Sequence, residues 1–247
     1  MDEKPNAAKP KSRRRWYQYS LRTLLIGVTL TGCGFGWFGA KLRSARLQRL
    51  AVERLESCNQ TVVYDYETRG PDVLWYREDI RPAAEPPGPA WLRSRLGKDF
   101  FATVVEIKLG TFWAQRDVFD LDVWQQFPEL KRLGLYGPSF ANDQALRQLP
   151  ELPQVEELCI GASSDEGLQF LKKFPKLRSL VIEQARVSRA AVENIAGLHG
   201  LEELSVYYFA DSNLKYVARL PNLRLLNLCF CGDAIPEAGT SQLVLCG

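Results

Sequence analysis

The sequence predicts an α/β solenoid in which short parallel strands alternate with helices, preceded by a single transmembrane helix. Two observations support this fold class. An apolar pattern of the form Leu-x-x-Leu-x-Leu recurs six times between residues 104 and 228. Near the N-terminus, residues 23–40 form an 18-residue segment without a charge. A recurring period of 22 to 26 residues is typical of repeat proteins, in which each unit buries its apolar face only against its neighbours.

Each occurrence of the pattern predicts a short strand with three aliphatic positions on the core side, because alternate strand residues point to opposite faces. The starts of successive strands are 26, 25, 22, 24 and 22 residues apart. The six predicted sets are Val104/Ile107/Leu109, Leu130/Leu133/Leu135, Val155/Leu158/Ile160, Leu177/Leu180/Ile182, Leu201/Leu204/Val206 and Leu223/Leu226/Leu228.

A helix is expected before five of these strands, because apolar residues recur there at three-residue spacing. Pro128, Pro153, Pro175 and Pro221 precede the strands by two residues and should end these helices, and His199 occupies the same place in the fifth repeat. Asp143, Asp165 and Asp211 precede the first apolar helix position by three residues, which predicts N-caps. The five helical sets are Leu121/Trp124/Phe127, Leu146/Leu149/Leu152, Leu168/Leu171/Phe174, Val192/Ile195/Leu198 and Leu214/Val217/Leu220.

With these residues the chain resembles the leucine-rich repeat family, in the ribonuclease-inhibitor-like form with helices on the convex side. The Arg-rich start, the apolar segment after Ser20-Leu21-Arg22 and the later Val62-Val63-Tyr64 resemble the membrane-anchored repeat proteins of planctomycete bacteria. The resemblance implies a horseshoe with a protein-binding role and no catalytic residues. The chain departs from the family where many repeats have a buried Asn: Pro138, Ser163, Ala185, Phe209 and Cys231 stand there instead.

The uncharged segment 23–40 is close to the shortest helix that spans a bilayer, and we expect it to be an uncleaved membrane anchor. Five glycines within it lower its helix propensity. A cleaved signal peptide is the less favoured alternative, because Trp37 and Phe38 stand where a cleavage site needs small residues. Leu30-Thr31-Gly32-Cys33 resembles a bacterial lipobox, so lipidation of Cys33 is a further alternative.

Charge is distributed unevenly along the chain. The first 60 residues carry 12 Lys/Arg and four acidic residues, so the remainder contributes −5 to the net charge of +3. Nucleic-acid binding by the repeats is therefore not expected, because phosphate affinity requires clustered positive charge. Seven basic residues precede the span and five follow it within twenty residues, which favours a cytoplasmic N-terminus and exported repeats at a bacterial inner membrane.

The remaining segments complete the domain organisation. We expect a basic tail at 1–22, the span at 23–40, a helical stalk at 41–58, a strand, Pro-rich linker and N-terminal cap at 59–98, and about six repeats at 99–247. Within the cap, residues 90–97 should form a helix whose core positions, Trp91, Leu92 and Leu96, cover the first repeat. A final edge strand is expected at 242–245.

Catalysis is not expected. The chain has a single histidine, His199, and its turn position lies away from the strands. No phosphate-binding or dinucleotide-binding glycine pattern occurs, and no cofactor is expected. The six cysteines have no spacing typical of a disulfide framework, and Cys229 and Cys231 lack a second pair that would complete a zinc site.

The predicted binding surface is the concave face, formed by the strand residues that point away from the core. Its three columns contain Glu106, Arg132, Glu157, Ser179, Glu203 and Leu225; Lys108, Gly134, Cys159, Val181, Ser205 and Asn227; and Gly110, Tyr136, Gly161, Glu183, Tyr207 and Cys229. We select Arg132, Tyr136, Glu157, Glu183, Glu203 and Tyr207 as partner-binding candidates, because aromatic and charged residues commonly dominate interfaces. A solvated strand face without a ligand is the competing interpretation.

Two functional hypotheses follow. In the preferred one, the chain is a membrane-tethered, non-catalytic module that presents its concave face to a protein or peptide of basic or mixed charge. In the alternative, it is a structural envelope or assembly protein without a discrete ligand.

Overall fold

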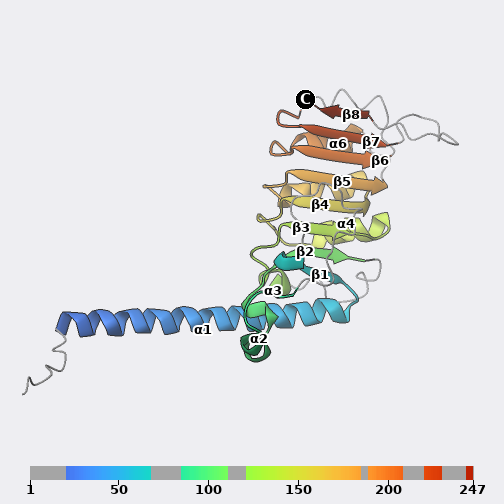
Figure 1. Ribbon diagram of the computed structural model, residues 1–247. Helices are drawn as coiled ribbons and strands as arrows, with labels where there is room; N and C mark the ends of the chain where they lie inside the picture. Colours follow the sequence, from blue (N-terminus) through green and yellow to red (C-terminus); the bar gives the residue numbers. More distant parts are fainter. Residues whose placement is uncertain are drawn as a thin grey trace, which may run out of the picture. The chain divides into compact units, whose positions relative to one another are not determined.

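The computed structural model describes residues 21–67, 85–110, 121–184, 189–207, 220–229 and 243–246. The chain divides into two units, Met1–Lys41 and Leu42–Gly247. The second unit has a mixed α/β fold with a mostly parallel sheet (Figure 1). The strands are β1 Thr61–Tyr64, β2 Val104–Leu109, β3 Arg132–Leu135, β4 Glu157–Ala162, β5 Ser179–Gln184, β6 Glu203–Tyr207, β7 Leu225–Cys229 and β8 Leu243–Cys246. The helices are α1 Leu21–Ser57, η1 Asp65–Glu67, α2 Ala90–Leu96, η2 Lys98–Phe100, α3 Leu121–Trp124, α4 Ser139–Gln148, α5 Asp165–Leu168, η4 Gln169–Lys173 and α6 Arg189–Ala196.

The eight strands of the described residues follow one another across the sheet in sequence order. Strands β2 to β7 pair in parallel, and β1 and β8 add antiparallel strands at the two ends. The central row of paired residues is Ile107, Leu133, Leu158, Leu180, Leu204 and Leu226. This row is the middle position of the sequence pattern, so the alignment of the repeats in the sequence is also the pairing register of the sheet.

The aliphatic strand positions form the core, as expected. Ile107, Leu133, Leu158, Leu180 and Leu204 are completely buried. The same hydrophobic cluster contains the helical positions Trp124, Leu146, Leu168, Leu171, Val192 and Ile195. The strands and helices therefore bury their apolar sides against each other, and successive helices α4, α5 and α6 also contact one another. Residues Leu214 and Val217 of the fifth predicted helix lie outside the described residues.

The second half of α1 belongs to this core. The helix expected at 41–58 is present as far as Ser57, and one of its faces is buried against the sheet, which a free stalk would not be. Ala45, Gln48, Ala51, Val52 and Leu55 are buried, and their spacing of three and four residues forms one helix face. The predicted cap helix α2 forms, but it has no buried residue, and Trp91 is 68% exposed. The apolar end of the sheet near β1 is therefore covered by α1. A short helix such as α2 could not bury comparable area.

The first half of α1 is the only helical segment among the described residues that is long and apolar enough to cross a membrane. Its apolar residues are exposed within the structure, including Leu24, Ile26, Leu30 and Phe35. An N-terminal signal sequence can have a similar length and composition. A Cβ atom added at any of its five glycines would meet no atom within 4 Å, so no packing among the described residues explains them.

The expected N-caps differ from the observed ones. Asp165 is the first residue of α5, and the cap is Ser164, whose Oγ accepts a hydrogen bond from Gly167 N. Asp143 lies within α4 and accepts hydrogen bonds from Ser163 Oγ at 2.7 Å and Ser164 N at 3.0 Å. Asp143 therefore ties its own repeat to the following one. Asp211 lies outside the described residues.

Asn142 forms a buried link between two loops. Its side chain is fully buried, donates to Gly137 O at 2.8 Å and Ala162 O at 2.6 Å, and accepts from Gly137 N at 3.1 Å. The loop after β3 is thus fixed to the end of β4. Buried amides and carbonyls need such partners, so this one side chain satisfies three backbone groups.

Lys173 makes a further link between repeats. Its Nζ donates to the carbonyl oxygens of Leu146, Arg147 and Leu149 at 2.5–2.9 Å, at the C-terminal end of α4. A positive charge is favourable at this end of a helix because the last carbonyls lack intrahelical partners. Burial lowers the pKa of the Lys173 ammonium. Lys173 is therefore a structural residue, whereas its neighbour Lys172 is exposed.

We predict that Leu180→Ala lowers the free energy of unfolding by about 2–5 kcal/mol, because it leaves a cavity at the centre of β5. Since each repeat is stabilised by its neighbours, hydrogen exchange should accelerate in β4 and β6 as well as in β5. Denaturation of the full chain in detergent, with hydrogen–deuterium exchange by mass spectrometry, measures both effects. An unchanged denaturation midpoint would contradict the assigned register.

Candidate functional site: the polar face of the sheet

The strand side chains that point away from the core form what we call the polar face. Register pairing places Glu106, Arg132, Glu157, Ser179 and Glu203 next to one another on β2 to β6. Neighbouring strands lie about 4.8 Å apart, so these side chains form one continuous row across the sheet. The sequence prediction that these residues share a surface is therefore consistent with the pairing.

At the β2–β3 end of the row, the charges neutralise one another. Glu106 is 8% exposed, and its carboxylate lies 3.3 Å from Lys108 Nζ and 3.1 Å from Arg132 Nε. The Arg132 Nε is buried and forms this ion pair without an aligned hydrogen bond. Desolvation offsets much of the attraction in such a buried ion pair, but the loss of one partner would leave an unpaired buried charge, which is destabilising. Arg132 is therefore already engaged within the chain.

Tyr136 lies along the face and does not project from it as the sequence analysis expected. A Cβ at Gly134 would overlap the Tyr136 ring, so the ring covers this buried glycine. Burial, the Cys159 thiol and the Glu183 carboxylate raise the pKa of the Tyr136 hydroxyl far above its usual value. Position 134 is a glycine because any side chain there would displace the ring.

Beneath Tyr136, Cys159 is completely buried and donates its thiol hydrogen to Glu183 Oε1 across 3.6 Å. Burial, and then the negative charge of Glu183, raises the pKa of the Cys159 thiol well above its usual value. A protonated buried thiol is a poor nucleophile, because the thiolate is the reactive form. The geometry therefore gives Cys159 a packing and hydrogen-bonding role.

Toward β6, the face carries carboxylates without a basic partner. Among the described residues, Glu157, Glu183 and Glu203 form no ion pair, and all three are half-buried. Burial is the main cause that raises the pKa of Glu157, and the charges of Glu106 and Glu203 add to it while Arg132 opposes it. This part of the face thus holds negative charge that the described part of the chain does not neutralise.

The remaining candidate residues lie at the end of β6 and in a turn. Tyr207 ends β6 and pairs with Cys229, but its side chain lies outside the described residues. His199 occupies a turn, where its carbonyl accepts a hydrogen bond from Asn222 Nδ2 at 2.7 Å. Within the part of the chain that the structure describes, no three His, Cys, Asp or Glu side chains are grouped as metal ligands would be.

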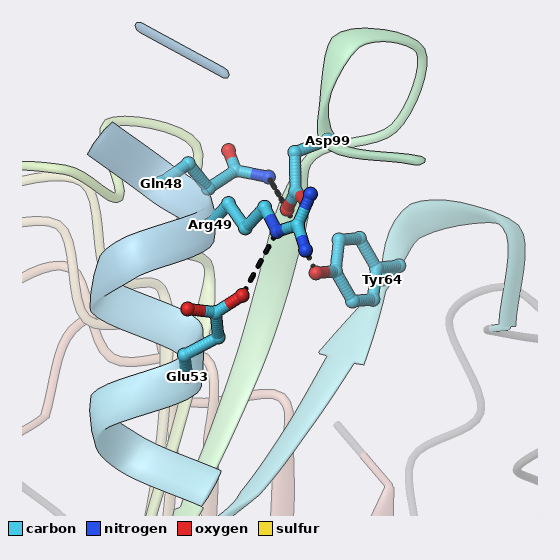
Figure 2. Close-up of polar contacts among 5 residues, drawn as sticks. All are labelled: Gln48, Arg49, Glu53, Tyr64 and Asp99. Carbon is cyan, nitrogen blue, oxygen red and sulfur yellow. Dashed lines mark hydrogen bonds and ion pairs between the residues drawn. The ribbon is translucent and has the colours of Figure 1, made fainter. Parts of the chain in front are cut away.

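A second polar cluster, which the sequence analysis missed, lies where α1 packs on the sheet. Figure 2 shows Gln48 and Arg49 of α1 pointing toward Tyr64 and Asp99. Asp99 Oδ1 accepts hydrogen bonds from Tyr64 Oη at 2.8 Å and Gln48 Nε2 at 3.1 Å. Gln48, Tyr64 and Asp99 are all buried, with exposed fractions of 1–7%. Burial and the Asp99 charge raise the pKa of Tyr64 far above its usual value.

This cluster holds α1 against the start of the sheet. Gln48 also donates to Ala102 O at 3.2 Å, and the Lys98 ammonium lies 4.4 Å from the centre of the Tyr64 ring. The cluster therefore joins α1, β1 and η2. A polar residue on the apolar face of a helix was the one signal in the sequence, since Gln48 lies among Ala45, Ala51, Val52 and Leu55.

Comparison of the chain with protein-family models, curated proteins and solved structures finds no match.

We predict that Glu157→Gln raises the melting temperature at pH 7 by about 1–2 °C, the shift that roughly 0.5 kcal/mol produces in a protein of this size. The folded state disfavours the ionised carboxyl, so its cost appears as the pH rises above the ordinary pKa and is absent below it. The difference from wild type should vanish below about pH 4. Glu106→Gln is the matched control: it should lower the melting temperature, because Lys108 and Arg132 lose their counterion. Destabilisation by Glu157→Gln at pH 7 would contradict this account.

Asp99→Ala should lower the free energy of unfolding by about 2–4 kcal/mol, because it leaves the Tyr64 hydroxyl and one of the two N–H groups of the Gln48 amide buried without an acceptor. Glu53→Ala on the same helix is the control. Its carboxylate forms an exposed ion pair with Arg49 at 2.8 Å, and such solvent-screened pairs contribute little to stability. Denaturation of both variants in detergent provides the comparison, and equal losses would mean that the Asp99 cluster does not hold α1.

Proposed function

We propose that the chain is a membrane-tethered solenoid of the leucine-rich repeat type that binds a protein or peptide, without catalysis, through the polar face of its sheet. The observation that carries this proposal is a set of three half-buried carboxylates on the polar face that have no basic partner among the described residues. Glu157 and Glu203 lie in one row on either side of Ser179, and Glu183 lies four residues beyond Ser179 on β5. The strand-by-strand register and the repeating aliphatic rows support the solenoid assignment.

The charge of the face indicates the chemistry of the partner. Glu106 is neutralised by two cations, but Glu157, Glu183 and Glu203 lie on adjacent strands without a basic partner among the described residues. A partner with Lys or Arg side chains would supply the missing counterions, and the half-buried setting would strengthen each pair relative to an exposed one. Nucleic acid does not fit this surface, since its phosphates would meet carboxylates.

The contact region is narrower than the sequence analysis expected. Arg132 and Tyr136 belong to the internal packing of the face, so their loss would disturb the fold as well as binding. Glu157, Glu183 and Glu203 are the residues that we assign to the partner. Ser179 lies between Glu157 and Glu203 in the same row, and Ser205 lies two residues beyond Glu203 on β6. Both serines are small enough to admit a long basic side chain.

The first half of α1 supplies the tether in this proposal, with the N-terminus in the cytoplasm and the sheet exported. Its apolar side chains are exposed in the structure, and the hydrocarbon core of a bilayer would cover them. The excess of basic residues before the span supports this orientation, since positive charge is retained on the cytoplasmic side.

The structural alternative is favoured by one specific observation. The β2–β3 end of the face satisfies its own charges through Glu106, Lys108 and Arg132, as a surface without a ligand would. If the charges of the whole polar face were neutralised within the chain in this way, the face would need no ligand, and the repeats would act as a spacer in the envelope. Site-specific crosslinking separates the two functions.

We predict that a photo-crosslinking amino acid at Ser179 of the full chain, expressed in its own membranes, yields one saturable adduct to a protein. The same group at Glu151, an exposed residue outside the polar face, should yield none. Glu157→Gln with Glu203→Gln should reduce the adduct at least about tenfold, the effect of 1.4 kcal/mol. Glu129→Gln with Glu151→Gln is the charge-matched control and should leave it unchanged. Equal adducts from both positions, or none from Ser179, would favour the structural alternative.

A further inference from the structure

The middle of the polar face has an ordered pattern along strand β5. Ser179, Val181 and Glu183 alternate with Leu180 and Ile182, which are completely buried in the core. The first three side chains therefore share the polar face at intervals of about 6.6 Å, because a strand rises about 3.3 Å per residue. Along β5 the face presents a small hydroxyl, an aliphatic side chain and a carboxylate in succession.

The position of Ser179 is flanked by carboxylates on both sides. Ser179 pairs with Glu157 of β4 and with Glu203 of β6, each on a strand about 4.8 Å away (Figure 1). All three side chains are half-buried, and the Ser179 hydroxyl forms no hydrogen bond among the described residues. Arg132, the register partner of Glu157 on β3, is paired with Glu106 at 3.1 Å. The two carboxylates beside Ser179 are therefore available to one cation from outside the chain.

A further carboxylate lies four residues beyond Ser179, at Glu183. Its Oε1 accepts the Cys159 thiol hydrogen across 3.6 Å, and its other oxygen has no partner among the described residues. Between the two acidic positions, the register row of the face consists of Cys159, Val181 and Ser205. Cys159 is completely buried and Val181 is 6% exposed. This row offers no counterion, so a charge placed on it would lose water without gaining a partner.

We propose that the polar face binds an extended peptide segment of the pattern basic-x-apolar-x-basic, which lies along β5 with an arginine over Ser179. An extended peptide presents every second side chain to one side at the same interval as the strand, so residues i, i+2 and i+4 would meet Ser179, Val181 and Glu183. A planar guanidinium with five N–H donors can bind both flanking carboxylates at once. The inference rests on the proposed function, since it specifies the ligand of the same face.

The spacing of the charges favours a peptide along β5 over one that crosses the strands. Glu157 and Glu203 are separated by two strand spacings, or about 9.6 Å. Side chains on one side of an extended peptide recur at about 6.6 Å and about 13 Å, so a crossing peptide would match one of these carboxylates and miss the other. Ser179 and Glu183 are about 13 Å apart on β5, which is the spacing of residues i and i+4.

The test measures binding of two fluorescent synthetic peptides to the full chain in detergent. The first contains Arg-Thr-Val-Thr-Arg, and the second contains the same residues as Arg-Arg-Val-Thr-Thr, with identical Gly-Ser flanks and blocked ends. Fluorescence anisotropy should give a dissociation constant at least about tenfold lower for the first peptide. With a benzophenone side chain in place of its Val, the first peptide should label residues 179–186, the tryptic fragment that contains Val181.

Two variants of the chain test the two charged positions separately. Ser179→Lys places a cation of the chain itself between Glu157 and Glu203, so it should weaken binding of the first peptide at least about tenfold without lowering the melting temperature. Ser94→Lys adds the same charge at an exposed position of α2 and should leave binding unchanged. Glu183→Gln should remove the preference for the first peptide, because only the peptide with the correct spacing reaches this carboxylate.

Equal affinity for the two peptides, or undiminished binding by a folded Ser179→Lys variant, would overturn this inference. Binding of neither peptide at millimolar concentration would also overturn it, whereas a saturable protein adduct at Ser179 in native membranes would still support the proposed function. If that adduct joins two copies of the chain, a second copy occupies the face and the peptide assignment is wrong. Loss of both the peptide preference and the native adduct would overturn the proposed function together with this inference.

Discussion

The stacking of aliphatic strand rows is the constraint on which the rest of the fold depends. A strand of four to six residues cannot bury three aliphatic side chains alone, so each row is covered by the rows on either side and by a helix. This requirement keeps β2 to β7 parallel and in register, with Leu158, Leu180 and Leu204 at its centre. It also places the intervening side chains on one continuous opposite face, which is where the proposed binding surface arises.

The same constraint means that the two ends of the stack need a cover, because the row at each end has a neighbouring row on one side only. At the start, antiparallel β1 pairs with β2, and the second half of α1 places Val52 and Leu55 in the core. The Asp99 cluster adds directional contacts to this apolar packing. At the other end, antiparallel β8 pairs with β7. One helix thus contributes both the apolar segment of the first unit and the cover of the sheet in the second.

Local periodicity was sufficient to predict the strands, their register and most of the buried helical positions, because these depend on spacing along the chain. The links between repeats were not predictable in this way. Asp143 was expected to cap its own helix but binds Ser163, and nothing in the sequence pattern distinguished Lys173, which binds three carbonyls at the C-terminal end of α4. Both roles depend on which loops the fold brings together, and the sequence spacing carries no information on that.

For the candidate site, the sequence likewise predicted which residues share a face but not the contacts between them. Alternation correctly assigned Glu106, Arg132 and Glu157 to one row, but it could not show that Glu106 holds Arg132 or that Tyr136 lies over Gly134. Conversely, Trp91 was expected in the core because it is large and apolar, yet it is exposed. An aromatic residue on a seven-residue helix can serve an outer surface as well as a core, and only the packing distinguishes the two.

The central claim is that the aliphatic rows are stacked in the register in which they align in the sequence, and engineered disulfides test it most directly. Ser179 and Glu203 are register partners on β5 and β6, so Cys substitutions at both should place the Cα atoms within the range of about 4.4–6.8 Å that a disulfide requires. The control is a variant with Cys at positions 179 and 205, because these two positions are two residues out of register. We expect mild oxidation of the full chain, followed by peptide mass spectrometry, to show a 179–203 disulfide and no 179–205 disulfide. Formation of the 179–205 disulfide instead would contradict the account.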